Sequence, residues 1–350
     1  MPNILIINAG STSLKYKLFD ASEKEINSGN FSDVSNLEKN IRNILKEAGG
    51  LMDIKAVGHR VVHGGDKFFK PTVVNDKIFA ELQELNHLAP LHNPHNLAGI
   101  RAMRNFLPAT PQIVVFDTAF YFDLPEVSRT YALPRGISEK YKIRRYGFHG
   151  ISHKFMAEEA ARELGIKTNK INLITCHLGG GWSITAVKNG KPIDTSMGYT
   201  PMEGLIMMTR PGDLDAGVVI ELLKKAPYYL GDEKCDDVYN LLNHESGVKG
   251  LSGESDYQEV LRKASLGMKD AKLAFDAAIY RLVKYIGAYW AALEGRVDAI
   301  VFSGAIGAGN PATRNEVTRK LKFLGNVLVL AIKANEELGI EREVRKILKM

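Results

Sequence analysis

The sequence has little of what would tie a protein to an oxidising compartment or to a membrane. Two cysteines, Cys176 and Cys235, occur in 350 residues, which is too few for a disulfide framework or a cysteine-rich zinc module. No apolar run approaches the ~18 residues of a membrane span, and the first residues lack the charged and apolar regions of a secretion signal. We therefore expect a cytoplasmic protein in a reducing compartment, with no membrane partner.

A strong charge of either sign is also missing. Lys and Arg number 46 and Asp and Glu number 40, which gives a net charge of +6 that is spread along the chain. No basic block is interleaved with aromatic residues, so nucleic acid is not an expected partner. A small cationic excess suits a small anionic substrate and a plain soluble surface equally well. With 45% hydrophobic and 25% charged residues, the chain has a globular composition, and its length suggests about two domains.

Several standard motifs of nucleotide and metal chemistry are absent. There is no Walker P-loop, and the glycines of residues 304–309 do not follow the Gly-x-Gly-x-x-Gly order of a dinucleotide fold. Kinase catalytic-loop and nucleophile-elbow patterns are missing as well. Histidine pairs such as His59 with His63 lack the His-Glu-x-x-His form and a nearby third ligand, so we expect no structural zinc. A dinucleotide-binding fold is therefore not supported.

The sequence does contain a series of short apolar runs that end in polar residues and are separated by helical patterns. The runs cover residues 4–7, 56–58, 113–116, 173–176 and 299–302. Residues 270–294 carry apolar side chains at a spacing of three and four, which predicts a long helix. Strands that alternate with helices predict an α/β fold, in which ligands bind at the carboxyl ends of the strands.

One strand–turn–strand pattern occurs in each half of the chain. The run 4–7 leads into the polar turn 8–13, and the run 173–176 leads into the turn 177–181 and a strand that starts at Trp182. This predicts a duplicated unit, although two similar hairpins can also arise without duplication. Small residues let a backbone approach phosphate oxygens, while an ordinary tight turn favours the same residues. Both interpretations stay open for each turn.

Two arginines stand in comparable polar contexts. Arg60 follows a predicted strand, and Arg210 lies in the turn 207–215. An arginine in such a turn commonly forms a surface ion pair. Its planar fork of donors also suits a carboxylate or a transferring phosphoryl group.

Together these motifs resemble the ordered signature of the acetate kinase family. The segments that carry the resemblance are INAGSTSLKYKLFD, GHRVVHGG, APLHNPHN, VFDTAF, RRYGFHGISH, ITCHLGGGWSI, DTSMGYTPMEGLIMMTRPGDLD, SGVKGLSGESD and ANEEL. The resemblance implies an α/β fold of two ribonuclease-H-like domains of the actin-like ATPase superfamily, with a catalytic cleft between them. It assigns residues 1–119 and the C-terminal helix 338–350 to the first domain, and residues 120–337 to a nucleotide-binding and dimerisation domain.

The resemblance also implies the reversible, Mg²⁺-dependent transfer of a phosphoryl group from ATP to acetate, giving acetyl phosphate and ADP, in a homodimer. A carboxylate is already anionic at neutral pH and needs no general base. The difficulty is instead the repulsion between the acid anion and the negatively charged phosphates of ATP, which positive charge, hydrogen-bond donors and a metal would offset. A sugar kinase would instead need a carboxylate such as Asp117 to accept the hydroxyl proton, and the paired arginines favour an acid. A kinase of propionate or butyrate, and a non-catalytic member of the fold, are the other candidates, and the intact catalytic motifs oppose the latter.

Residue by residue, the resemblance assigns a catalytic group, a metal site, a first phosphate loop and an acyl pocket. The implied catalytic residues are Arg60, His92, Asp117, His149 and Arg210. Asn8 and Glu336 would help to hold Mg²⁺. The first phosphate loop would contain Ser11, Ser13 and Lys15. The pocket for the acyl chain would be lined by Val62, Leu91, Phe148 and Pro201, beside Arg60.

The residues implied to bind ATP or ADP lie where the sequence departs from the family. They are His177, Leu178, Gly179, Gly180 and Gly181 in a second phosphate loop, and Asp256, Gly304, Ala305, Gly307 and Gly309 around the nucleoside. Gly180 stands where the family has Asn, Trp182 where small residues are usual, and Gln258 where Arg is common. Residues 305–309 differ from Gly-Ile-Gly-Glu-Asn, and the region 314–335 is shorter than usual. We expect ATP as the donor, with another nucleotide or a non-nucleotide phosphate as the alternative, and Trp182 partly filling the nucleoside space.

Overall fold

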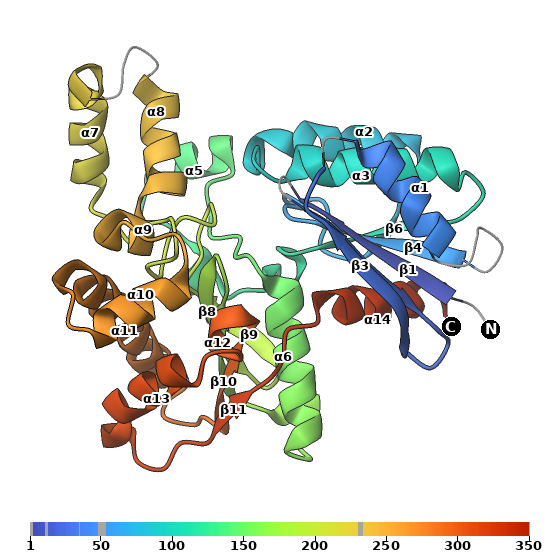
Figure 1. Cartoon of the computed structure of the whole chain (residues 1–350). Coiled ribbons are helices and arrows are strands. Elements are labelled where there is room, and N and C mark those ends of the chain that lie inside the picture. The colour runs from blue at the N-terminus through green and yellow to red at the C-terminus, as the bar shows by residue number, and fades with distance from the viewer. Residues whose placement is uncertain (1–2, 11–12, 35, 48–53, 230–233, 350) are drawn as a thin grey trace. The chain divides into compact units, whose positions relative to one another are not determined.

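Two β-sheets with helices packed on their faces organise the chain (Figure 1). The computed structural model describes residues 3–10, 13–34, 36–47, 54–229 and 234–349. Contacts divide the chain into two compact units. Unit 1 comprises Met1–Phe122, His149–Phe155 and Asn335–Met350, and unit 2 comprises Asp123–Phe148 and Met156–Ala334. Within the described ranges, no helix is both long and apolar enough to cross a membrane.

Unit 1 is built on a six-stranded sheet with the order β3-β2-β1-β4-β6-β5. Its strands are β1 (Asn3–Ala9), β2 (Leu14–Phe19), β3 (Glu25–Phe31), β4 (Ile54–Val61), β5 (Thr72–Val73) and β6 (Gln112–Phe116). Because β1, β4 and β6 run parallel, their carboxyl ends meet at one edge of the sheet. β2 pairs with β1 in antiparallel register, which sets Asn8 opposite Lys15.

Different helices cover the two faces of this sheet. The helices of unit 1 include α1 (Leu37–Glu47), α2 (Asp76–Glu84), α3 (Asn93–Phe106) and α14 (Glu336–Leu348). Leu5 and Ile7 of β1 pack with α1 and α3, whereas Ile4 and Ile6 pack with α14 on the opposite face. Side chains alternate in this way because the strand has a period of two. Each such fully buried aliphatic side chain contributes about 1.5–3 kcal/mol.

Unit 2 repeats this plan on a five-stranded sheet with the order β11-β10-β7-β8-β9. Its strands are β7 (Leu173–Leu178), β8 (Trp182–Lys188), β9 (Lys191–Thr195), β10 (Ala299–Ser303) and β11 (Val329–Ala331). On one side of β7, β8 pairs with it in antiparallel register and β9 pairs in antiparallel register with β8. On the other side, β10 and β11 run parallel to β7. In unit 1, β1 lies between β2–β3 and β4–β6 in the same manner. The duplication predicted from the repeated hairpin and the α/β fold predicted from the alternation of strands and helices are therefore confirmed.

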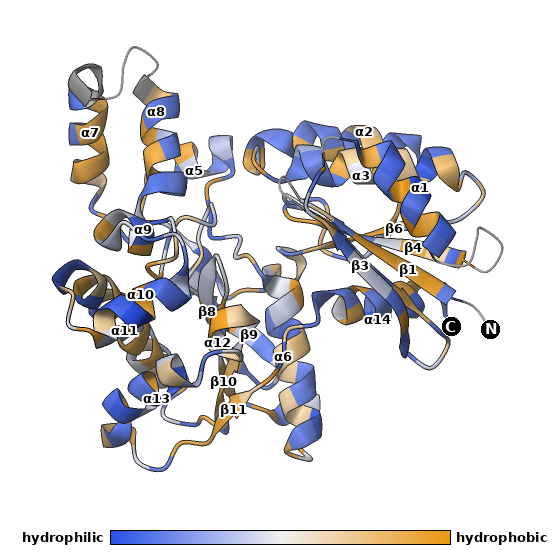
Figure 2. Cartoon of the chain, viewed as in Figure 1, coloured by the Kyte–Doolittle hydropathy of each residue, from blue (hydrophilic) through white to orange (hydrophobic). Residues whose placement is uncertain are grey.

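The helices of unit 2 include one long element that the apolar spacing predicted. They are α4 (Glu126–Arg129), α5 (Arg135–Tyr141), α7 (Ala216–Tyr229), α8 (Lys234–Asn240), α9 (Gly247–Ser252), α10 (Tyr257–Ser265), α11 (Lys269–Ala292), α12 (Gly304–Gly307) and α13 (Pro311–Lys320). The predicted helix 270–294 corresponds to α11, whose buried face includes Ile279, Leu282 and Ile286. Figure 2 shows strands β1 and β10 in hydrophobic colours, which agrees with their burial in the two cores.

The compact units differ in detail from the domains expected from the sequence. The expected second domain, residues 120–337, includes the start of α6 (Gly150–Glu163), but His149–Phe155 clusters with unit 1. The reason is local. The amide of Gly150 donates to the carbonyl of Asp117 at 3.0 Å, and Ile151 packs in the core that α14 forms with the unit 1 sheet. No periodic pattern in the sequence predicts that His149–Phe155 belongs to the first unit.

Candidate active site

Two parallel strands of unit 1 bring Arg60 and Asp117 together. Arg60 lies near the carboxyl end of β4, and Asp117 directly follows β6, whose register sets Val61 opposite Phe116. Arg60 Nη2 is 2.6 Å from Asp117 Oδ2, and Arg60 Nε donates to Oδ1 at 3.1 Å. Glu336, the first residue of α14, adds a second carboxylate, with Oε2 3.6 Å from Arg60 Nη1. The resemblance had placed all three residues in one site, and within unit 1 they are in contact.

The neighbouring carboxylates determine the direction in which the pKa of Arg60 shifts. Burial alone would lower the pKa of Arg60, but the charges of Asp117 and Glu336 outweigh burial and raise it. Burial raises the pKa of the Asp117 carboxyl, and the guanidinium opposes that rise. Arg60 and Asp117 form an ionised pair, because the guanidinium keeps its proton at any physiological pH and donates two hydrogen bonds to the carboxylate.

His59, which precedes Arg60, has a structural role. Its side chain is buried, and its Nε2 lies 2.8 Å from Oε1 of Gln112 on the neighbouring strand. Burial lowers the pKa of His59 to about 4, with the Gln112 contact opposing it. The ring is therefore neutral at physiological pH. His59 is thus a hydrogen-bonded histidine of the unit 1 core.

The backbone positions His149 beside Asp117. A Cβ on Gly150 would lie 2.1 Å from the carbonyl oxygen of Asp117, so only glycine permits this approach. His149 itself adopts a left-handed conformation with φ of 55°, which is uncommon for a residue with a side chain and is found preferentially at functional sites. The sequence motif predicted a role for His149, and the structure adds the glycine contact that fixes its backbone.

Two buried asparagines of α3 hold the loops around this site, and the sequence analysis did not single them out. Asn96 Nδ2 donates to the carbonyl of Ala9 at 2.6 Å, and its Oδ1 accepts from the amide of Val62 at 3.1 Å. Asn93 makes a similar pair of bonds with the backbone of His63. A signal was present, because both asparagines lie in the APLHNPHN segment. Leu91 and His92 of that segment lead into α3, with His92 at its N-cap.

The first hairpin places its predicted residues at the turn between β1 and β2. Asn8 is partly buried near the end of β1, and Lys15 is exposed on β2. The amide of Gly10 donates to the carbonyl of Ser13 at 2.8 Å, which closes the turn. Ser11 lies outside the described residues.

The two residues assigned to the metal have side-chain oxygens of the kind that bind Mg²⁺. Asn8 offers an amide oxygen and Glu336 a carboxylate, the hard donors that Mg²⁺ prefers. In the described part of the chain, no group of three or more His, Cys, Asp or Glu could hold a metal. Mg²⁺ commonly takes one or two protein ligands and completes its shell with water and substrate phosphates.

Arg210, in unit 2, lacks the carboxylate partners that Arg60 has. Its Nη1 donates to the carbonyl of Pro201 at 2.8 Å and contacts Sδ of Met207 at 3.7 Å. No acidic side chain within the described ranges pairs with it. Burial lowers the pKa of Arg210, with Tyr239 opposing. A largely buried cation without a counter-ion is costly, and such a group is suited to bind an anionic ligand.

A network that the sequence analysis did not identify anchors the segment carrying Pro201 and Arg210. Arg145 Nη2 lies 2.6 Å from Oε1 of Glu203, and its Nη1 donates to the carbonyls of residues 195–197. The hydroxyl of Tyr131 donates to the other oxygen of Glu203. Arg145 belongs to the RRYGFHGISH segment, but its partners come from distant parts of the sequence. Spacing alone does not reveal such a pairing.

The second glycine turn lies where the resemblance placed a phosphate loop. His177 and Leu178 are the last residues of β7, and Gly179 to Gly181 form the turn to β8. Met208 donates its amide to the carbonyl of Gly180 at 3.2 Å. The loop is thereby tied to the segment that carries Arg210.

The segment expected to form a glycine-rich nucleoside loop is helical at its start. Residues Gly304–Gly307 form α12, and Asn310 caps α13 by accepting from the amide of Thr313. Gly304 has φ of 82°, and a Cβ there would lie 2.4 Å from the carbonyl oxygen of Leu178, so α12 begins directly against the end of β7. Ala305 and Gly309 are exposed. Asp256 caps α10 and is exposed.

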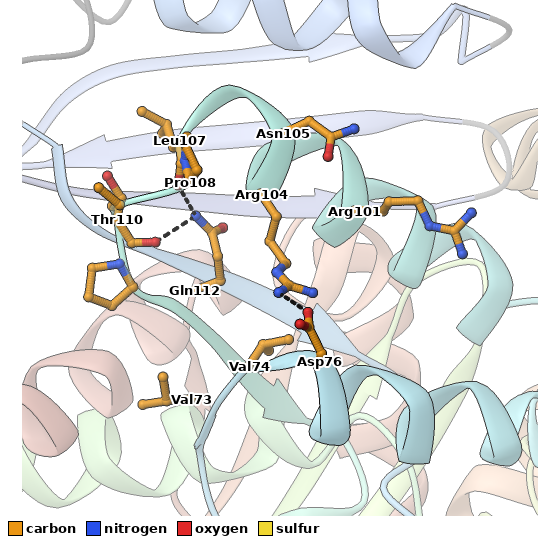
Figure 3. Close-up of a pocket in the computed structure, with 12 residues that line it drawn as sticks. Val73, Val74, Asp76, Arg101, Arg104, Asn105, Leu107, Pro108, Thr110 and Gln112 are labelled. Atoms are coloured by element: carbon orange, nitrogen blue, oxygen red, sulfur yellow. Dashed lines mark hydrogen bonds and ion pairs between the residues drawn. The ribbon is translucent and has the colours of Figure 1, made fainter.

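A separate pocket in unit 1 contains none of the predicted site residues (Figure 3). It has a volume of about 470 Å³ and lies at the amino end of β6, where Gln112 donates to the carbonyls of Leu107 and Thr110. Arg104 on its wall is paired with Asp76 at 2.6 Å. Because Asp117 follows the opposite end of β6, this pocket is not part of the candidate active site.

Two repeated α/β units, the first of which has Arg60 and Asp117 at the carboxyl ends of its parallel strands, define a protein of the actin-like ATPase fold class. Within that class, residues 33–341 match the Acetokinase family. The chain belongs to this family. An acetate kinase from Helicobacter acinonychis is 44% identical, over 96% of this chain and 91% of that protein.

Solved structures agree with this assignment. The crystal structure of acetate kinase from Porphyromonas gingivalis has a TM-score of 0.90 and 35% identity, covering 99% of this chain and 100% of that one. A propionate kinase from Francisella tularensis has a TM-score of 0.90 and 34% identity, covering 98% and 99% of the two chains. The alignment with the Helicobacter protein has 370 positions but includes only 96% of the 350 residues of this chain. At more than thirty positions the relative therefore has a residue and this chain has a gap.

Proposed function

We propose that this protein transfers the terminal phosphoryl group of ATP to acetate, reversibly and with Mg²⁺, to give acetyl phosphate and ADP. Arg210 carries the proposal. It is a largely buried guanidinium whose side chain meets a carbonyl and a thioether in the described structure and no carboxylate. Membership of the Acetokinase family and the likeness to acetate kinases support the reaction.

The geometry around Asp117 favours an acid over an alcohol as the acceptor. A sugar kinase requires a carboxylate that can accept the hydroxyl proton. Asp117 instead directs both of its oxygens to Arg60. Acetate needs no proton removed, so a carboxylate that orients an arginine is sufficient.

In this proposal the arginines and a histidine supply positive charge and donors to the reacting groups. Arg60 and Arg210 would bind the acetate carboxylate and the moving phosphoryl group, and His149 would donate a hydrogen bond to the latter. Asp117 would hold Arg60 in orientation, and His92 would shape the site. Bound Mg²⁺ would neutralise charge on the donor phosphates, with Asn8 and Glu336 as its protein ligands.

The acyl pocket would consist of Val62, Leu91, Phe148 and Pro201. Val62 and Phe148 are buried, with 6% and 1% of their surface exposed. Buried apolar walls discriminate acids by about 1–3 kcal/mol per methylene. We therefore propose acetate as the preferred acid, with propionate as the nearest competitor because a propionate kinase is structurally similar.

The donor would bind to unit 2. The loop from His177 to Gly181 would receive the phosphates, with Ser13 and Lys15 of the first hairpin and, outside the described residues, Ser11. The nucleoside would lie near Asp256 and the start of α12, at Gly304, Ala305, Gly307 and Gly309. The resemblance further implies a homodimer, which sedimentation velocity would test.

The experiment is trapping of the acyl phosphate with hydroxylamine. Purified protein, ATP and Mg²⁺ are incubated with acetate, propionate and butyrate in parallel, and the hydroxamate formed is measured. We expect acetate to give the highest kcat/KM and omission of the acid to give none. A folded, monodisperse protein that forms no hydroxamate with any of the three acids would contradict the proposal. A higher kcat/KM for propionate would correct the substrate and leave the reaction class in place.

A further inference from the structure

The turn between β7 and β8 consists of three consecutive glycines, which have no side chains to hold it in place. Glycine loses more conformational freedom on ordering than any other residue, so this loop requires outside contacts to adopt one conformation. Gly179 donates its amide to the carbonyl of Gly181 at 3.1 Å, and Met208 donates to Gly180 at 3.2 Å. A further contact comes from a side chain, because Trp182 Nε1 donates to the carbonyl of Gly179 at 2.9 Å.

Trp182 is well placed to act as a fixed anchor. It is the first residue of β8, pairs with Leu178 of β7, and has 0% of its surface exposed. Its ring makes an edge-to-face contact with Tyr257 at 5.8 Å between centroids. Its indole is therefore buried between the loop and the start of α10.

The contact continues from Tyr257 to the start of α13. The hydroxyl of Tyr257 lies 3.0 Å from Oγ1 of Thr313, and both the amide and the hydroxyl of Thr313 donate to Asn310 Oδ1. One chain of side chains thus joins the glycine loop to the first turns of α10 and α13. These are the two helix starts that flank Asp256 and α12, where the proposed function puts the nucleoside.

We propose that Trp182 is a positioning residue for the phosphoryl donor: its indole holds the loop Gly179–Gly181 in the conformation that receives the donor phosphates and couples the loop to the nucleoside side. This inference rests on the proposed function. Trp182 acts through the loop, since its side chain is buried and its N–H is already bonded to Gly179. Donor binding, rather than acid binding, therefore depends on this N–H.

The first test compares two matched substitutions. Trp182→Phe keeps an aromatic ring against Tyr257 and removes the N–H, while Trp290→Phe makes the same change at the other tryptophan of the chain, on α11. We expect Trp182→Phe to raise the KM for ATP by about three- to tenfold, the range for one lost hydrogen bond, with the KM for acetate unchanged. Trp290→Phe should leave both constants at the wild-type values. An unchanged KM for ATP in Trp182→Phe, or equal rises in both constants, would overturn the positioning role.

The second test is spectroscopic. The chain has two tryptophans, so Trp290→Phe leaves Trp182 as the only indole. Titration of this variant with MgADP should change its emission, whereas acetate alone should not. MgADP binding, measured in parallel by equilibrium dialysis, without any change in emission would contradict the inference.

The third test separates this inference from the proposed function. Hydrogen–deuterium exchange of the peptide covering residues 173–188 is measured without ligands in wild type and Trp182→Phe. We expect faster exchange at the glycine amides in the variant, and equal exchange would refute the anchoring. Failure of the wild type to form an acyl phosphate would refute the proposed function, whereas normal formation with an unchanged KM for ATP in Trp182→Phe would refute only the role of Trp182.

Discussion

Arg60 and Asp117 face each other at the ends of neighbouring parallel strands, with Nη2 2.6 Å from Oδ2 and Nε 3.1 Å from Oδ1. The pair fixes the orientation of a cation that would otherwise be free to rotate about its long side chain. Arg210 has no such partner in the described part of the chain. Asp117 thus fixes the orientation of Arg60, whereas the charge of Arg210 can be neutralised by a bound ligand.

Removal of the charge at Asp117 should reduce both turnover and stability. Asp117→Asn keeps the shape but leaves Arg60 without its principal partner, and breaking a buried pair costs about 3–5 kcal/mol. Misplacement of a reacting group by about 1 Å can cost ~10²-fold in rate, so we expect kcat to fall by that order. Steady-state kinetics and urea unfolding measure the two effects. Glu343→Gln, which removes the carboxylate that pairs with Lys154 on unit 1, is the control and should retain kcat. A wild-type kcat in Asp117→Asn would show that the ion pair does not serve catalysis.

Shortening of Val62 should widen the acyl pocket. Val62→Ala removes two methyl groups from a position with 6% exposed surface, and a methylene in such a pocket is worth about 1–3 kcal/mol. We expect the ratio of kcat/KM for propionate to that for acetate to rise by about tenfold. If the ratio stays at its wild-type value, Val62 does not line the acyl pocket.

Selectivity among purine nucleotides should be loose. Gln258 and Ala308 stand where the family has an Arg and a Glu, and loss of one hydrogen bond typically forfeits about 0.5–1.5 kcal/mol. We expect ATP, GTP and ITP to be used within about tenfold of one another, a difference of ~1.4 kcal/mol. Initial rates against donor concentration at fixed acetate and Mg²⁺ provide the comparison, with pyrophosphate included. A preference for ATP of a hundredfold or more would mean that other residues restore the selectivity.

The buried His59 should make the protein less stable in mild acid. Burial lowers its pKa to about 4 in the folded state, whereas the unfolded value is about 6.5. Below about pH 6.5 the unfolded chain therefore binds a proton that the folded protein does not, and each pH unit costs about 1.4 kcal/mol. Stability is complete above pH 6.5 and falls as the pH approaches 4.

The check is urea unfolding of wild type and His59→Gln at pH 7.5 and 5.0. Glutamine does not titrate, so the free energy of unfolding of the variant should fall by about 2 kcal/mol less than that of the wild type between these pH values. Equal losses in the two proteins would show that His59 does not titrate between its folded and unfolded states in this range.

Part of the fold and site could be predicted because the relevant signals are local. The apolar runs before Asn8 and His177 marked the two equivalent central strands, and the repeated hairpin indicated the duplication. Arg60 and Asp117 each follow an apolar run, and in a parallel arrangement the ends of such strands meet at one edge. The pairing of these two residues is a direct consequence of that topology.

Other features depend on contacts between distant segments. Arg145 reaches Glu203 and the carbonyls of residues 195–197, and Asn96 joins Ala9 to Val62. Neither contact leaves a periodic pattern in the sequence. The helix at Gly304–Gly307 was missed because glycine disfavours helices, and here tertiary packing against Leu178 outweighs that preference. The contact of Trp182 with Tyr257, which lies on another element, likewise has no signal in the sequence.

The central claim is that the guanidinium of Arg210, which has no carboxylate partner among the described residues, binds the reacting anions. Arg210→Ala should lower kcat for acetyl phosphate formation by at least ~10²-fold, as loss of one transition-state donor does. Its stability should equal or exceed that of the wild type, because the substitution removes a partly buried charge that has no carboxylate partner among the described residues. The decisive measurement is kcat with saturating ATP and acetate, combined with the unfolding midpoint of the same preparation. A loss of turnover without loss of stability is the result we predict, and wild-type turnover in a folded Arg210→Ala protein would contradict the account.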